Sequence, residues 1–277
     1  MAIMKLISVN DLSLQIEGYF AFKHVAFSLS QNEIIGINGD NGSGKTQLLE
    51  AIVSNKTPDS GTIDYTPGVR IGYLPQENPQ VIEQSTGKYL EEMRRLSKKL
   101  AVRKDQLQAM ITYMGLSPYL DTPVNQLSLG LKRQVDFLSA VAGHPNVLVL
   151  DEPFAFQSEK TIQRMLDLII DLKNNNSGII LSATQFDKRI ATNFDQLYLL
   201  DGDLKNIAAE QKNEPVSLLV FHVSPNSMAI TPDVEDFLVS NQDNQIELEV
   251  PLKKRQIILN KMVQLNYQFE GMRKIEN

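Results

Sequence analysis

Two hydrophobic patterns succeed one another along the chain. In residues 1–35, apolar positions such as Leu12, Leu14 and Ile16 alternate with polar ones, which predicts half-buried antiparallel strands. Further along, continuously apolar runs predict buried parallel strands at residues 34–37, 147–150 and 178–182. Strands that alternate with helical segments predict a parallel sheet with right-handed crossovers. The pattern therefore favours an α/β fold with an N-terminal antiparallel part.

The period becomes helical from about residue 85. Tyr89, Met93 and Leu96 share one face of a predicted helix, and a second apolar stripe ends at Gly115. This predicts a helical subdomain, at about residues 85–135, inserted into a main domain at 1–205. Residues 206–277 form a predicted α+β appendage, with strands near 218–223, 245–250 and 267–269 and helices near 232–239 and 252–265.

A glycine-rich segment follows the first buried strand and precedes a helix, and it reads Gly39-Asp40-Asn41-Gly42-Ser43-Gly44-Lys45-Thr46. Glycines let backbone N–H groups approach a phosphate closely, and the start of the helix adds unpaired donors and a positive dipole end. Lys45 can reach the terminal phosphates of a nucleotide, and Thr46 offers a hydroxyl to Mg²⁺. The segment therefore predicts a phosphate site.

Two adjacent carboxylates, Asp151 and Glu152, end the apolar run at 147–150. Ligands of open α/β sheets bind at the carboxyl ends of the strands, so both residues should face the glycine-rich segment. Neighbouring residues of a strand point to different sides, which predicts two roles. Asp151 would hold Mg²⁺ through water, and Glu152 would orient or deprotonate an attacking water molecule.

Other candidate residues carry weaker signals. Gln76 at a strand end can reach a metal ion or a water molecule, although a loop glutamine is usually solvated. Tyr19 can stack on a purine ring, although a core aromatic is the commoner reading of its pattern. Ser128 is placed as a helix N-cap, and Gly130 leaves the backbone accessible near the start of that helix.

Composition narrows the possible functions. The chain has 277 residues, 42% of them hydrophobic and 22% charged, as in ordinary globular proteins. A formal charge of −6 gives no support for a nucleic-acid surface, and we expect no nucleic-acid partner. The absence of cysteine excludes disulfides and thiolate metal sites. No apolar run approaches the ~20 residues that span a bilayer, so a membrane connection would come through a partner chain.

Taken in order, these motifs resemble the nucleotide-binding subunit of ABC transporters, over residues 1 to about 205. The resemblance identifies residues 39–46 with the Walker A loop, Gln76 with the Q-loop glutamine and 148–152 with Walker B plus the catalytic glutamate. Residues 127–134 resemble the signature segment, and Tyr19 occupies the place of the adenine-stacking aromatic. The resemblance implies a P-loop NTPase with a RecA-like parallel-sheet core, and ATP and Mg²⁺ as cofactors.

In this family two subunits close around two ATP molecules. The resemblance therefore implies that Ser128 and Gly130 of one chain contact the γ-phosphate held by Lys45 of the other. The partner is expected to be a second copy or a paired ATPase subunit, and the helical segment and the Gln76 loop would contact an integral membrane permease.

Several positions depart from the family pattern. Leu129 and Leu131 replace a common glycine and glutamine, a form similar to bacitracin-resistance-type and other ABC-2 exporter subunits. Residues 155–158, Ala-Phe-Gln-Ser, replace the usual D-loop and put communication between the two sites in doubt. Gln185 stands where the switch histidine is expected, and it can bond a phosphate oxygen but cannot carry a proton as imidazole does. Gln47 replaces a hydroxyl residue, which weakens one α-phosphate contact.

Because Lys45 and Glu152 are retained, we expect ATP hydrolysis that is present but slow, with Gln185 assisting. The leading interpretation is a cytoplasmic ATPase subunit of an exporter, bound to the inner face of the cell membrane through its permease. One alternative is a soluble ABC-type switch that acts on a non-membrane partner. Another is a catalytically weak half of a heterodimeric pair.

Overall fold

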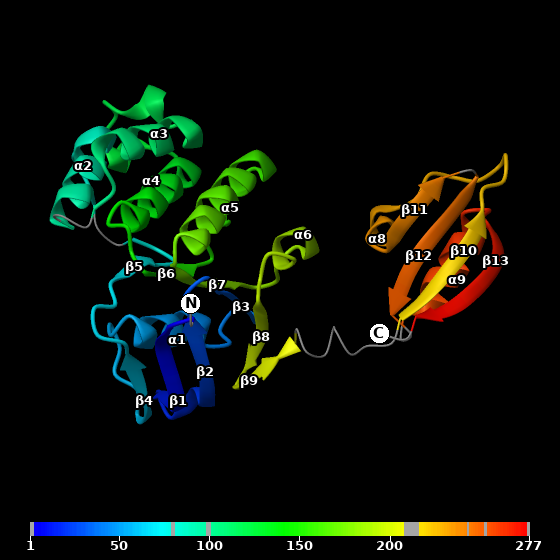
Figure 1. Ribbon diagram of the computed structural model, residues 1–277, viewed down its shortest axis with the longest axis horizontal. Helices are drawn as coiled ribbons and strands as arrows, with labels where there is room; N and C mark the ends of the chain where they lie inside the picture. The colour runs from blue at the N-terminus through cyan, green and yellow to red at the C-terminus, as the bar shows by residue number, and fades with distance from the viewer. Residues whose placement is uncertain are drawn as a thin grey trace. The chain divides into compact units, whose positions relative to one another are not determined.

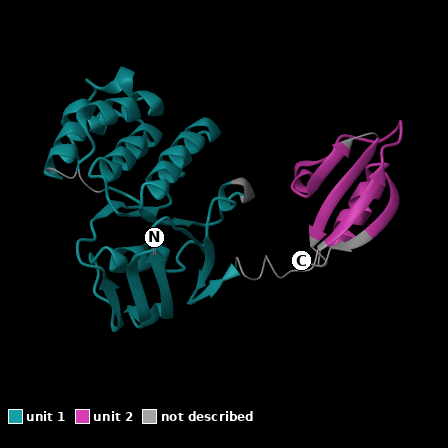
Figure 2. Cartoon of the chain, viewed as in Figure 1, with its two compact units in different colours: residues 1–207 teal, residues 208–277 magenta. Residues whose placement is uncertain are grey.

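The computed structural model describes residues 3–78, 81–97, 101–207, 216–242, 244–251 and 254–275. The chain divides into two units, residues 1–207 and 208–277 (Figure 2). Each unit has its own hydrophobic core, and each is described by itself below.

The N-terminal strands form a three-stranded antiparallel sheet, as the alternating pattern predicts. Its strands are β1 (Lys5–Ile16), β2 (Tyr19–Ser30) and β4 (Ser60–Tyr65), in the order β2-β1-β4. Glu17 and Gly18 adopt positive φ angles and turn β1 back along β2, where Leu12 lies opposite Val25. The buried face of this sheet joins the main core of the first unit together with helix α1 (Lys45–Ile52) (Figure 1).

A six-stranded sheet forms the centre of the first unit, in the order β5-β6-β7-β3-β8-β9. Its strands are β3 (Ile34–Asn38), β5 (Ile71–Leu74), β6 (Val147–Asp151), β7 (Gly178–Ala183), β8 (Gln196–Asp201) and β9 (Asp203–Asn206). All neighbours pair in parallel except β8 and β9, which Gly202 joins in a tight turn at φ 72. The sequence pattern did not predict β9. The parallel strands end at one edge of the sheet. The glycine-rich loop follows β3 at this edge, and the segments with Gln76, Glu152 and Gln185 follow β5, β6 and β7.

Helices cover this sheet and form the insertion between β5 and β6 (Figure 1). They are α1 (Lys45–Ile52), α2 (Thr86–Leu96), α3 (Lys104–Met114), α4 (Leu129–Val141), α5 (Glu159–Asn174) and α6 (Lys188–Ala191), with 3-10 turns η2 (Ser117–Tyr119) and η3 (Val124–Gln126). Gly115 ends α3 at φ 80, and α2 packs on α4. The predicted helical segment is therefore built from α2, α3 and the start of α4.

In the part that the structure describes, the second unit is a four-stranded antiparallel sheet, in the order β11-β12-β10-β13, with the helices α8 and α9. Its elements are β10 (Val216–His222), α8 (Pro232–Glu235), β11 (Leu238–Gln242), β12 (Gln245–Pro251), α9 (Arg255–Gln264) and β13 (Gln268–Ile275). The succession β-α-β-β-α-β is the ferredoxin-like arrangement. The helix predicted at 232–239 is wrong beyond Glu235, because Leu238 starts a strand that pairs with Leu248 of β12.

Candidate nucleotide-binding site

The glycine-rich loop folds so tightly that side chains are excluded at two of its positions. Gly44, the N-cap of α1, has φ 93, and a Cβ there would lie 2.3 Å from the carbonyl oxygen of Ala21. A Cβ on Gly39 would lie 2.4 Å from Ser43 Oγ and 2.6 Å from the carbonyl oxygen of Leu200. The loop therefore holds its backbone N–H groups around the start of α1, which suits an anion.

Lys45 spans this loop and points toward the end of β6. The side chain is 5% exposed, and Nζ donates to the carbonyl oxygens of Gly39 at 2.6 Å and Asp40 at 3.0 Å. The same Nζ lies 3.9 Å from Oε1 of Glu152. The structure thus brings together the lysine and the carboxylate that the sequence places about one hundred residues apart.

A hollow of about 180 Å³ lies at this meeting point. The glycine-rich loop, the segment after β5 and the end of β6 all contribute, and the lining residues are Asn41, Gly42, Gly44, Lys45, Thr46, Gln47, Gln76 and Glu152. Most of the predicted phosphate-binding residues therefore surround one space. Ser43 is not part of this lining, and its buried Oγ makes no hydrogen bond within the described residues.

Oxygen donors that suit Mg²⁺ adjoin this hollow. Thr46 Oγ1 donates to Gln76 Oε1 at 3.2 Å. Asp151 is fully buried, and its Oδ1 accepts a hydrogen bond from Ser182 Oγ at 2.5 Å. Its Oδ2 is buried without a hydrogen-bond partner in the described part of the chain. Mg²⁺ prefers oxygen ligands, with one or two carboxylates beside phosphate and water, so this set fits the ion. In the described ranges, no group of three or more His, Cys, Asp or Glu side chains is placed to hold a metal ion.

Arg133 connects the segment that carries Gln76 with the end of β6 that carries Asp151. It was not singled out from the sequence. Its guanidinium donates to the carbonyl oxygens of Pro75, of Gln76 at 3.1 Å and of Asp151. Burial lowers the pKa of this guanidinium, while the negative charges of Asp136 and Asp151 oppose that shift. A signal was available, because Arg133 precedes the buried Phe137 by one helical turn and therefore shares its inward face.

The segment after β7 lies between the loop and the β6 carboxylates, because β7 stands between β3 and β6. Thr184 Oγ1 donates to Asn41 Oδ1 at 3.3 Å, and the Thr184 carbonyl accepts from Gly39 N at 3.3 Å. Gln185 and Glu152 both line a second hollow of about 330 Å³. Gln185 and the predicted catalytic carboxylate therefore line one common space.

Tyr19, Ser128 and Gly130 are predicted to contact a nucleotide but do not line the Lys45 hollow. Tyr19 is 81% exposed at the start of β2, two residues before the Ala21 carbonyl that touches the loop. Ser128 is the N-cap of α4, with Oγ accepting from Leu131 N at 3.3 Å, as predicted. Neither Ser128 nor Gly130 reaches the hollow of its own chain, which is the arrangement expected if these residues serve a partner's nucleotide.

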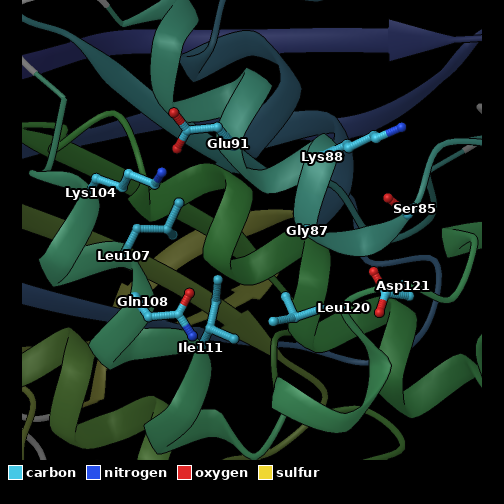
Figure 3. A pocket seen from close by; sticks show the side chains of 10 residues that line it. All are labelled: Ser85, Gly87, Lys88, Glu91, Lys104, Leu107, Gln108, Ile111, Leu120 and Asp121. Atoms are coloured by element: carbon cyan, nitrogen blue, oxygen red, sulfur yellow. The ribbon is translucent and has the colours of Figure 1, made fainter.

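A further hollow of about 360 Å³ lies within the helical insertion (Figure 3). Leu107, Ile111 and Leu120 form its apolar part, and Lys88 and Lys104 extend at its edge. It belongs to α2, α3 and the segment after η2, away from the glycine-rich loop. No described helix is long and apolar enough to cross a membrane.

Comparison with known proteins agrees with this geometry. Residues 22–155 match the family model described as ABC transporter. This part of the chain, which holds the glycine-rich loop and the end of β6, is therefore similar to ABC transporter ATP-binding proteins. The chain is 26% identical over 186 residues to an ABC transporter ATP-binding protein of Methanocaldococcus jannaschii, covering 66% of this chain and 69% of that one. It is 32% identical over 149 residues to the zinc import ATP-binding protein of Chromohalobacter salexigens, covering 54% and 60%.

Solved structures share the fold of most of this chain. An ATP-binding subunit of an ABC transporter superposes with a TM-score of 0.64 at 22% identity, covering 72% of this chain and 88% of that one. A dimeric bacterial ABC transporter cassette gives 0.63 at 18% identity, covering 72% and 97%. The matches span only 60 to 69% of the relatives named above. The predicted P-loop fold, with its antiparallel and parallel sheets, is confirmed.

Proposed function

We propose that this chain binds MgATP in the hollow beside Lys45 and hydrolyses it to drive a membrane transporter. The observation that carries the proposal is the 3.9 Å approach of Lys45 Nζ to Glu152 Oε1, within a hollow lined by the glycine-rich loop. A cation held beside a carboxylate at a phosphate cradle is the arrangement that phosphoryl transfer to water requires.

Each residue has a separate part in this reaction. The loop N–H groups and Lys45 would bind the phosphate oxygens and stabilise the charge that develops there. Glu152 would take the proton of the attacking water, and Gln185 would hold that water or a phosphate oxygen as a neutral hydrogen-bond partner. Thr46, Gln76 and Asp151 would hold Mg²⁺, which supplies charge neutralisation when bound. The neutral Gln185 supports slow rather than fast turnover.

We propose that two chains close around two nucleotides, either as a homodimer or with a paired ATPase subunit. The capped start of α4 supports this, because Ser128 and Gly130 offer helix-start donors outside their own hollow. ABC cassettes dimerise, as the cassette of similar fold does. Tyr19, exposed near the loop, is the proposed stacking surface for the adenine.

We propose further that the helical insertion contacts separate membrane permease subunits, which would place the chain at the cytoplasmic face of the membrane. The hollow between α2 and α3 offers apolar side chains inside a charged rim, which suits a short amphipathic segment (Figure 3). The form of residues 128–132 supports export, whereas the zinc import relatives are named for the opposite direction.

Hydrolysis by the purified chain tests the catalytic assignment. Glu152→Gln should lower kcat by roughly 10²–10⁴-fold, because general-base catalysis is removed, while ATP binding is retained. Glu92→Gln, which neutralises an exposed carboxylate on α2, should leave kcat unchanged. Equal turnover in wild type and Glu152→Gln would reject the assignment of Glu152. ATP-dependent dimers without phosphate release from the wild type would favour the weak-half alternative.

A second measurement tests the transport role. The tagged chain is purified from detergent-extracted native membranes, and any multi-span membrane protein that copurifies is reconstituted with it in vesicles. ATP-driven transport by these vesicles, with faster ATP hydrolysis than the free chain shows, would support the proposal. A soluble partner with no membrane protein would favour the switch alternative.

A further inference from the structure

The segment that carries Gln76 depends on side-chain contacts for its shape. Residues 75–78 follow β5 and belong to no described helix or strand. Arg133 of α4 donates to the carbonyl oxygens of Pro75 and Gln76, which fixes the part of the segment nearest to β5. The residues that follow Gln76 need a contact of their own, because an irregular segment has no regular backbone ladder to hold it.

Asp136 of α4 supplies that contact. Its Oδ1 accepts a hydrogen bond from Asn78 Nδ2 at 3.1 Å. Asp136 follows Arg133 by about one helical turn, so both side chains lie on one face of the helix. One helix therefore bonds the segment on both sides of Gln76.

Asp136 lies where a charged acceptor is effective. The residue is half-buried. Burial raises the pKa of its carboxyl group, and the Asn78 hydrogen bond and the positive charges of Arg133 and Lys132 oppose that shift. Burial also raises the pKa of Tyr89 of α2, and the charge of Asp136 adds to that rise, so this ring lies nearby. A hydrogen bond to a carboxylate that is partly shielded from water is stronger than one between neutral groups, so this bond can hold the segment.

Gln76 is the side chain that this contact serves. Its Oε1 accepts from Thr46 Oγ1 at 3.2 Å beside the Lys45 hollow, among the oxygen donors that suit Mg²⁺. Neither Asp136 nor Asn78 lines that hollow. We propose that Asp136, through Asn78, is a positioning residue that holds Gln76 at the Mg²⁺ of a bound MgATP. The inference rests on the proposed MgATP site, and the loss of such an outer contact commonly weakens metal binding about 10–100-fold.

An exchange of the two side chains tests this role. Asn78→Asp sets two carboxylates against each other, which should push the segment away from α4. Adding Asp136→Asn restores one amide facing one carboxylate, with donor and acceptor exchanged. The measured quantity is the factor by which Mg²⁺ lowers the dissociation constant of ATP below its value in EDTA, found by equilibrium dialysis in a Glu152→Gln background. Asn78→Asp should reduce this factor about 10–100-fold, and the double exchange should restore it.

The direction of the effect separates positioning from charge. An added carboxylate near the site would by itself attract Mg²⁺ and increase the factor, so a decrease means that the Gln76 ligand has moved. The dissociation constant of ATP in EDTA should stay the same, because the glycine-rich loop and Lys45 are unaltered. If Asn78→Asp also loses ATP binding in EDTA, Asn78→Ala replaces it. That variant removes the donor without adding charge, and the same decrease is expected.

Asn10→Asp is the matched control. Asn10 Nδ2 donates to Asp64 Oδ2 at 2.9 Å on the exposed antiparallel sheet, so the same substitution creates the same repulsion there and should leave the factor unchanged. In a Gln76→Ala background, Asn78→Asp should have no further effect, because the ligand through which it acts is gone. A full factor in Asn78→Asp, no recovery in the double exchange, or an undiminished effect without the Gln76 amide would overturn the positioning role. A parent protein that binds no ATP, or whose affinity Mg²⁺ does not increase, would instead overturn the proposed function.

Discussion

Replacing Arg133 by lysine tests whether one side chain holds the metal-binding segments in place. Arg133 is 7% exposed, and its two terminal nitrogens bond three carbonyl oxygens, those of Pro75, Gln76 and Asp151. The flat guanidinium reaches the ends of β5 and β6 together, whereas the single nitrogen of lysine cannot span them. At least one buried carbonyl should therefore lose its charged donor.

The expected loss follows from the bonds that remain. A hydrogen bond to a charged group contributes about 1.5–3 kcal/mol, and a buried acceptor left unpaired costs about 1–3 kcal/mol. Arg133→Lys loses one such bond but keeps the positive charge, so we expect it to be destabilised by about 3 kcal/mol. For a unit of this size that corresponds to a fall in Tm of roughly 6–12 °C. The concentration of Mg²⁺ needed for half-maximal ATPase should also rise, because Gln76 and Asp151 lose their shared anchor.

Differential scanning calorimetry and Mg²⁺ titrations of ATPase activity measure the two effects. The endotherm of the second unit, which does not contain Arg133, serves as an internal reference. Arg103→Lys is the matched control, because Arg103 pairs with Asp105 at 2.9 Å on the exposed surface, where such a change should alter Tm by less than about 2 °C. A melting temperature of Arg133→Lys equal to that of Arg103→Lys would refute the proposed bridge.

Three further changes have expected outcomes. Gly44→Ala should abolish nucleotide binding in equilibrium dialysis, because the new Cβ would meet the Ala21 carbonyl at 2.3 Å on a left-handed backbone; normal affinity would contradict the loop geometry. The Arg94 guanidinium holds the pKa of Glu91 at about 2, so stability from this carboxylate is full above its ordinary pKa and is lost as the pH falls toward 2. The Tm advantage of wild type over Glu91→Gln should therefore shrink between pH 5 and about pH 2 by circular dichroism, and a constant difference would exclude the pairing. Ser128→Ala should lower Tm by roughly 2–4 °C through loss of an N-cap worth about 1 kcal/mol and should weaken the ATP-dependent dimer more than the monomer; an unchanged dimer would remove Ser128 from the interface.

The parallel strands and the phosphate loop could be predicted because their signals are local. Residues 39–46 require glycine where the backbone turns against Ala21 and Leu200, and that requirement shows in the composition of the segment itself. The run at 147–150 is apolar on both faces because β6 lies inside the sheet. Their meeting at one edge followed from the general rule for open α/β sheets.

Residues that act across distant segments could not be predicted in the same way. Ser182 bonds Asp151 because β7 lies next to β6 with these two residues in register. The apolar segments that form β6 and β7 do not reveal which strands become neighbours. The spacing of Arg133 from Phe137 predicts an inward-facing side chain, but its bonds to Pro75 and Asp151 depend on how α4 packs against β5. In the second unit, the helix expected at 232–239 was overridden when the core took Leu238 into strand β11.

Glu152 stands at φ 48, so the chain turns left-handed at the very residue proposed to activate water. Asparagine or glycine would adopt that angle with less strain, and neither could act as the base. Selection for stability and selection for ATP hydrolysis therefore favour different residues at this position. Laboratory evolution for heat tolerance alone should therefore select Asn or Gly at position 152. The resulting proteins should be more stable and should bind the nucleotide without hydrolysing it.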